Sequence, residues 1–279
     1  MTEEKSARLA AIRQANAAQR PPADSLSAAP PTAAPMLAPA PVVPNAAAAR
    51  DDFIDLPPAI AFSSLLILLL SGIVGAFAAI LLLPDWLPGL SSSLRGNEPK
   101  AFWYLARSSA FVSYGLLGLS MAFGLLMTNK LARIWPGGPT AFDLHQHTSL
   151  LGLAFGIFHA LILMGDHYIA ATLKQVLTPF RYSGYAPFWV GLGQVGLYGM
   201  ALIGLSFYVK PVLGRQAWRI IHVLSFVVFM LALVHGIMSG TDTGTRFGRT
   251  IYWVSGGVLL FLTLYRILAL PQTRVSVKR

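Results

Sequence analysis

Six long apolar segments, almost free of charged residues, decide which folds are open to this chain. A helix needs about 20 residues to cross the hydrocarbon core of a bilayer, and a helix satisfies its own backbone hydrogen bonds there. Apolar residues make up 55% of the chain and charged residues 11%, and most of the charged residues lie outside the apolar segments. We therefore predict an all-α membrane protein. The predicted spans are about Ala59–Leu83, Ala101–Met127, Phe142–Gly165, Ala186–Val209, Ala217–Ser239 and Thr250–Leu270.

The connections between these spans are short and rich in residues that favour turns. They hold Pro84, Pro88, Pro99, Pro136, Gly137, Gly138, Pro139, Pro179 and Pro211. We predict one six-helix transmembrane bundle over residues 58–270, followed by a short cytoplasmic tail at 271–279. Residues 1–57 are polar and then Pro/Ala-rich, a composition that favours extended, unpacked chain. We expect a mostly disordered cytoplasmic arm there.

The distribution of lysine and arginine predicts the orientation in the membrane. The side that holds both termini carries fourteen of these residues and the opposite side carries six. We expect both termini to be cytoplasmic in a multi-pass protein of the cell (inner) membrane. The net charge of +10 then reflects topology and attraction to anionic lipid. Nucleic acid is not an expected partner, because the aromatic residues gather at span ends instead of alternating with basic ones.

Four histidines lie inside two of the predicted spans, His145 and His159 in the third and His222 and His235 in the fifth. Separations of fourteen and thirteen residues set each pair about 20 Å apart along a helix. Both spans begin on the cytoplasmic side, so His145 and His222 share an inner level, and His159 and His235 share an outer level. This pattern predicts two b-type hemes, each held by two axial histidines. The chain has no cysteine, so covalent attachment through Cys-x-x-Cys-His is excluded.

The register of these histidines is imperfect. At about 100° per residue, fourteen residues return to within about 40° of the starting face, but thirteen leave His235 about 140° from His222. Tilt, a local helix distortion or different ring approaches must absorb this difference. His147 competes with His145 for the inner level, but it lies twelve residues before His159 and has the poorer register. We expect His147 to be an interfacial histidine and His167 to be exposed to water.

Two arginines are candidates to bind heme propionates. Arg107 lies about two turns into the second span from the outer side, where a bare guanidinium is costly. It either pairs with a propionate of the outer heme or extends to the interface, and the sequence favours neither. Arg219, between Trp218 and His222, offers donors at the inner level. We assign no catalytic residue, because two histidines saturate the axial positions of each iron and favour electron transfer.

Several motifs in these segments resemble the ferric reductase-like transmembrane domain family. That superfamily includes ferric reductases, the membrane core of NADPH oxidases and the heme-binding membrane subunit of the methionine sulfoxide reductase system. The similar stretches are Asp143-Leu144-His145-Gln146 with His159, Trp218-Arg219-Ile220-Ile221-His222 with His235, Trp103 to Ser109, and His235 to Asp242. The resemblance covers roughly residues 100–270. It implies a six-helix b-type cytochrome with inner ligands His145 and His222 and outer ligands His159 and His235.

The chain departs from ferric reductases and NADPH oxidases in one respect. No Gly-rich nucleotide-binding loop follows a strand in this sequence. We therefore expect an electron-transfer subunit of an oxidoreductase that lacks its own flavin and NAD(P)H domain. It would depend on a separate donor, a flavoprotein or a quinol, and on an acceptor at the outer side, with a flavin or quinone at the bundle surface left open. The alternative is a non-redox scaffold or assembly subunit of a larger membrane complex.

Overall fold

Six helices in the computed structural model are long and apolar enough to cross a membrane, which confirms the predicted all-α, six-span architecture. The structure describes residues 57–87 and 100–269. The N-terminal arm, the connection at 88–99 and the C-terminal tail lie outside these residues, so the expected disorder of the arm stays a prediction. The six spans are α2 (Phe62–Trp86), α4 (Ala101–Thr128), α5 (Gly138–Ile162, continued by the 3-10 turn Leu163–Gly165), α7 (Pro187–Ser206), α9 with α10 (Arg215–Val223 and Ser225–Ser239) and α11 (Arg246–Ala269).

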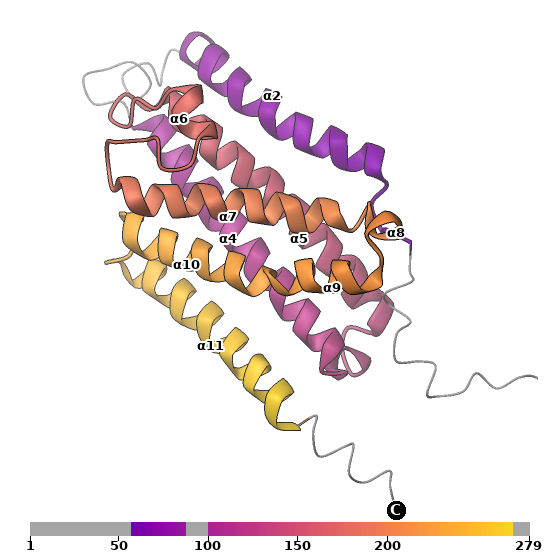
Figure 1. The fold of residues 1–279 in the computed structure, drawn as a ribbon. Helices are drawn as coiled ribbons and strands as arrows, with labels where there is room; N and C mark the ends of the chain where they lie inside the picture. Colours follow the sequence, from indigo (N-terminus) through magenta and orange to yellow (C-terminus); the bar gives the residue numbers. More distant parts are fainter. Residues whose placement is uncertain (1–56, 88–99, 270–279) are drawn as a thin grey trace, which may run out of the picture. The chain divides into compact units, whose positions relative to one another are not determined.

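Each helix of the bundle packs mainly against one or two particular neighbours (Figure 1). The most extensive contact joins α4 to α5, and the next joins α7 to α10, while α2 lies on α5 and α11 lies on α4. Among the spans, α5 has the largest buried share. The histidine-bearing helix α5 is therefore the centre of the bundle.

Packing inside the bundle is apolar, and so is much of its outer surface. One core cluster joins α4, α10 and α11 through Tyr114, Met121, Phe229 and Leu259. A second joins the outer ends of α4 and α5 through Phe102, Ala106 and Ile162. Large apolar side chains such as those of Ile67 and Leu260 remain more than half exposed. Such a surface is unfavourable in water and suits the hydrocarbon of a bilayer.

The fifth span differs from its prediction, because it consists of two helices. Helix α9 ends at Val223 and α10 begins at Ser225. At Leu224 the backbone has ψ −11°, and its N–H donates to the carbonyl of Ile221 at 3.1 Å, which is the tighter i→i+3 bond. A 3-10 step of this kind changes the rotation of everything that follows it. The break lies between His222 and His235, and a local helix distortion there is one of the three ways in which the sequence allows the difference in register to be absorbed.

Two prolines assigned to connections lie inside the terminal turns of helices. Pro139 is in the first turn of α5, where the N–H that proline lacks has no intrahelical partner anyway. Pro84 lies in the last turn of α2, which ends at Trp86. A proline near a helix end removes only one hydrogen bond from the ladder, so these residues do not end the spans as expected.

The connections that the structure describes contain three short helical pieces besides the turn that continues α5. The 3-10 turn η4 (Leu131–Arg133) follows α4, and α8 (Lys210–Leu213) precedes α9. At the other end α6 (Leu173–Leu177) begins with a capping box formed by Thr172 and Gln175. The segment around α6 is fastened to α7, since Gln194 Nε2 donates to the carbonyls of Gln175 and Val176 at 2.7 and 2.8 Å. This fixed segment covers the outer level of the bundle.

Candidate functional site

The structure brings the four span histidines together in two facing pairs. The ring centroids of His145 and His222 lie 5.8 Å apart with an interplanar angle of 72°. Those of His159 and His235 lie 6.3 Å apart at 65°. The pairs form between α5 and α9 at one level and between α5 and α10 at the other. The break at Leu224 lets the fifth span turn both of its histidines toward α5.

Three of the four rings are fixed by hydrogen bonds to backbone carbonyls of neighbouring helices. The Nδ1 atom of His145 lies 2.8 Å from the carbonyl oxygen of Ser120, and that of His159 lies 2.8 Å from Ala106. The Nδ1 atom of His235 lies 2.9 Å from the carbonyl of Trp189. A carbonyl oxygen only accepts, so Nδ1 carries the proton in each ring. In the neutral ring the lone pair is then on Nε2, the form and atom that ligate a metal.

The environment of His145 contains two serine hydroxyls. Ser120, 4% exposed on α4, has its Oγ 3.1 Å from His145 Nδ1 and 2.5 Å from the Oγ of Ser149. The same Nδ1 therefore has both a carbonyl and a hydroxyl of Ser120 within reach. Ser120 of α4 thus holds the His145 ring of the inner pair in place.

His222 is oriented by stacking. Its ring lies 4.9 Å from the Trp218 ring at an interplanar angle of 23°, one turn earlier on α9. Trp218 in turn contacts Phe207 at 6.1 Å. The buried Nε1 of Trp218 and Nε2 of Gln146 have no hydrogen-bond partner among the described residues. These two donors lie on the helices that carry the inner histidines.

A cavity of about 290 Å³ adjoins the outer pair, and both His159 and His235 line it. Its walls include many small residues: Ala106, Ala110, Gly156, Ala160, Gly193, Gly196, Ala232 and Gly236. A Cβ added at Gly193 would lie 2.5 Å from His235 Nδ1, and one at Gly156 would lie 3.2 Å from Ser113 Oγ. Glycine is thus required where the helices and the ring approach closely. Ser239, whose buried Oγ has no partner among the described residues, also faces this space.

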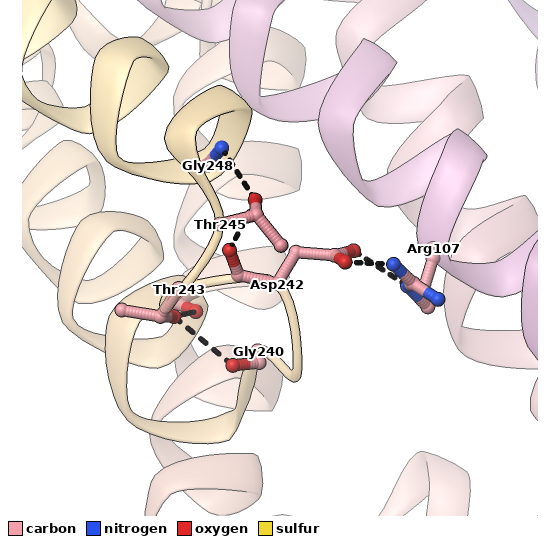
Figure 2. A network of polar contacts seen from close by, with 7 residues as sticks. Arg107, Gly240, Asp242, Thr243, Thr245 and Gly248 are labelled. Atoms are coloured by element: carbon pink, nitrogen blue, oxygen red, sulfur yellow. Dashed lines mark hydrogen bonds and ion pairs between the residues drawn. The ribbon is translucent and has the colours of Figure 1, made fainter.

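Arg107 lies in the wall of the same cavity and forms an ion pair with Asp242 (Figure 2). The Nε of Arg107 donates to Oδ2 of Asp242 at 2.5 Å, and Nη2 donates to Oδ1. The guanidinium carbon lies 4.1 Å from the Trp103 ring centroid, a cation–π contact. From the sequence we expected Arg107 to pair with a heme propionate or to extend to the membrane interface. The structure shows a partner that neither alternative included, the carboxylate of Asp242.

The remaining predicted candidates are exposed. His147 is exposed, and its Nδ1 is 2.8 Å from the carbonyl of Asp143 in its own helix. His167 is exposed after the end of α5. Arg219 is exposed on α9, three residues before His222. The structure therefore places neither His147 nor His167 in the paired arrangement.

Sequence reasoning did not assign roles to the residues that hold the rings in place. Ser120, Ala106 and Trp189 act through backbone carbonyls, which every residue carries, so no residue type marks them. Asp242 is different, because it is an acidic residue three positions after Ser239, the last residue of α10, and lies within the His235–Asp242 motif. A carboxylate near a membrane span calls for a cationic partner, and Arg107 is the basic residue of the second span.

Within residues 57–87 and 100–269, no three His, Cys, Asp or Glu side chains cluster as the ligands of a metal ion would. The histidines come in twos, which is the donor set of axial heme coordination. A metal–imidazole bond of about 2 Å on each side of one iron sets the ring centroids about 6 Å apart. The observed separations of 5.8 and 6.3 Å fit this requirement.

No protein-family model matches the chain, and no curated protein or solved structure matches it. The resemblance to ferric reductase-like domains therefore rests on the residues and their spacing. The chemistry of the two pairs has to be argued from their geometry.

Proposed function

We propose that this protein is a membrane b-type cytochrome that carries electrons across the bilayer through two bis-histidine hemes. The observation that carries the proposal is the pair of facing rings at each of two levels. Three of these rings have Nδ1 fixed by a carbonyl, and the fourth is fixed by stacking on an indole. His145 and His222 would hold the inner heme, and His159 and His235 the outer one.

Each heme would supply one-electron chemistry, alternating between ferric and ferrous iron. Two histidines at each level would hold the iron, and their binding would favour electron transfer over ligation of a substrate. Carbonyl acceptors at Nδ1 fix the ring orientation and raise the basicity of the ligand nitrogen. The apolar walls keep water from the site, which tunes the potential. The bundle thus favours electron passage over binding of a substrate at the metal.

The outer cavity supports the proposal through its shape and its polar groups. Small residues leave a space beside His159 and His235, as a flat ring would require. Arg107 uses two of its five N–H donors on Asp242, which leaves others for a propionate. At the inner level Arg219 is the corresponding candidate, with the buried donors of Trp218, next to Arg219 in the sequence, and of Gln146, next to His145.

Partners and orientation follow from the same proposal. Electrons would enter at the inner pair from a flavoprotein or a quinol and leave at the outer pair to a separate acceptor. The excess of lysine and arginine on the side that holds both termini supports the proposal that this side is cytoplasmic and that the protein lies in the inner membrane. A larger membrane complex would bring donor and acceptor together.

A second candidate function has its own supporting observation. Hydrogen bonds from His145 and His159 to α4 carbonyls, and from His235 to an α7 carbonyl, are also how a purely structural histidine ties helices together. In that case the protein is a non-redox scaffold or assembly subunit. Heme content separates the two functions.

The decisive experiment is heme quantification on protein purified in detergent from heme-replete cells, with spectra of the oxidised and dithionite-reduced forms. We expect about two hemes b per chain with low-spin bands. A preparation without heme would reject the cytochrome and favour the scaffold. One heme per chain would reject half of the ligand assignment.

A further inference from the structure

The two outer histidines belong to different packing units of the bundle. His159 lies on α5, which packs most extensively on α4, and its Nδ1 is held by the α4 residue Ala106. His235 lies on α10, which packs most extensively on α7, and its Nδ1 is held by the α7 residue Trp189. Contact between α4 and α10, and between α5 and α7, is much smaller. The ring spacing at the outer level therefore depends on what joins these two units.

We propose that the Arg107–Asp242 ion pair joins the two units at the outer end and positions His159 and His235 against each other. Arg107 follows Ala106 directly in α4, and Asp242 lies seven residues after His235. The bidentate contact between them thus connects the carbonyl support of one ring to the helix that carries the other. This role rests on the proposed function, since the spacing matters to a heme. Both residues are positioning residues and need no contact with the iron.

The backbone around Asp242 forms a turn that several hydrogen bonds stabilise, as Figure 2 shows. The Oγ1 of Thr243 lies 2.9 Å from the carbonyl of Ile237 and 3.0 Å from that of Gly240. The carbonyl of Asp242 accepts from both the N–H and the hydroxyl of Thr245, at 2.9 and 2.7 Å. Thr245 Oγ1 accepts from the N–H of Gly248 at 3.0 Å. Through these hydrogen bonds the turn connects Asp242 to the end of α10 and to the beginning of α11.

The ion pair has the geometry and setting of a strong one. The side chains of Arg107 and Asp242 are 28% and 16% exposed, so solvent screens them less than it screens a fully exposed pair. Trp103 covers the guanidinium. The two parallel hydrogen bonds between the guanidinium and the carboxylate also fix the relative orientation of the two side chains, which a single hydrogen bond from a lysine would not do.

The test uses the full-length protein with R107Q, D242N, and the exchanged pair R107D/D242R. Two properties are measured: hydrogen exchange of peptides covering residues 236–248, and the electron paramagnetic resonance signals of the two low-spin hemes. We expect about tenfold faster exchange in both single variants, the factor that corresponds to about 1.4 kcal/mol. We also expect a shift of the heme signal that H235A abolishes, with the other signal unchanged. The exchanged pair should restore both properties in part, because an ion pair of the opposite direction can form.

R249Q is the matched control, because Arg249 is an exposed arginine in the first turn of α11. It should change neither property. Unchanged exchange in R107Q and D242N would overturn the proposal while leaving the cytochrome intact. Faster exchange with an unchanged outer signal would also overturn it, since the ion pair would then join helices without positioning the ligands. A heme-free wild type would reject the proposed function instead, and exchange alone would still decide whether the pair joins α4 to the α10–α11 turn.

Discussion

At the scale of single residues, the roles of the six histidines are separated by their surroundings. His145, His159, His222 and His235 have rings that face a second ring and are fixed by a carbonyl or an indole. His147 and His167 are exposed and face no second ring. A neutral imidazole with a fixed Nδ1–H is prepared for ligation at Nε2. The same residue type therefore occupies two different environments in one chain.

Substitution of a single paired histidine should remove one heme. We expect H235A to lose the outer heme and H222A the inner one, because each iron then keeps one axial ligand. Heme content per chain should fall from about two to about one, measured by absorbance after extraction against protein concentration. H147A is the control and should keep both hemes. Two low-spin hemes in H235A or H222A would contradict the ligand assignment.

Gly193 sets a further limit on the outer pair. A Cβ there would lie 2.5 Å from Nδ1 of His235, so G193A should push the ring away from the carbonyl of Trp189. Overpacking of this kind costs about 1–3 kcal/mol, and we expect the outer heme to be lost or its spectrum to change. G115A is the control, since a Cβ at Gly115 of α4 would meet nothing within 4 Å. Equal heme content and spectra in the two variants would contradict this account.

At the scale of secondary-structure elements, the break between α9 and α10 reconciles two histidines that a straight helix would separate. Thirteen residues at about 100° each leave the rings about 140° apart. The i→i+3 step at Leu224 occurs between them, and both rings then face α5. The irregularity of the fifth span thus lets both of its histidines face α5.

A one-residue insertion at this break should prevent the two histidine pairs from forming at the same time. Insertion of one alanine after Leu224 rotates α10 by about 100° relative to α9, so only one of the two pairs can form. We expect about one heme per chain, measured as above. L224A keeps the length of the span and should retain both hemes, because Leu224 is 45% exposed. Two hemes in the insertion variant would show that the break is not needed for pairing.

At the scale of the whole molecule, the two histidine pairs lie at different depths along the bundle and would define a path for electrons between them. The connection between α4 and α5 and the connection between α5 and α7 lie at opposite ends of the bundle, because α5 runs from one to the other. Lysine and arginine are more numerous on the side of the α4–α5 connection. Electrons that enter at one level and leave at the other would thus cross the membrane.

The orientation can be measured with single cysteines, because the chain has none of its own. Ile134 is 84% exposed in the connection after α4, and Tyr168 is 82% exposed in the connection after α5. A membrane-impermeant thiol reagent added to intact cells should label Y168C, and it should label I134C only after permeabilisation. Labelling of I134C but not Y168C in intact cells would reverse the proposed direction.

The sequence by itself determined the six spans and the two levels of histidines. Hydropathy fixes a span because the bilayer excludes unsatisfied backbone and charge, and the rise of a helix converts residue spacing into depth. Both depend on residues close together in the chain, so no knowledge of packing was needed. His147 and His167 could be set apart by the same local reasoning.

Only the tertiary structure decided which groups hold the histidines and what Arg107 contacts. Arg107 and Asp242 are 135 residues apart in the chain, and Trp189 and His235 are 46 apart. Such contacts depend on how helices pack, and a backbone carbonyl carries no mark of residue type. The break at Leu224 belongs to the same class, because the spacing showed an imperfect register, while only the structure shows that a break absorbs it and where the break lies. Local periodicity thus predicts the elements and their depth, and long-range packing selects the partners that would make the histidine pairs function.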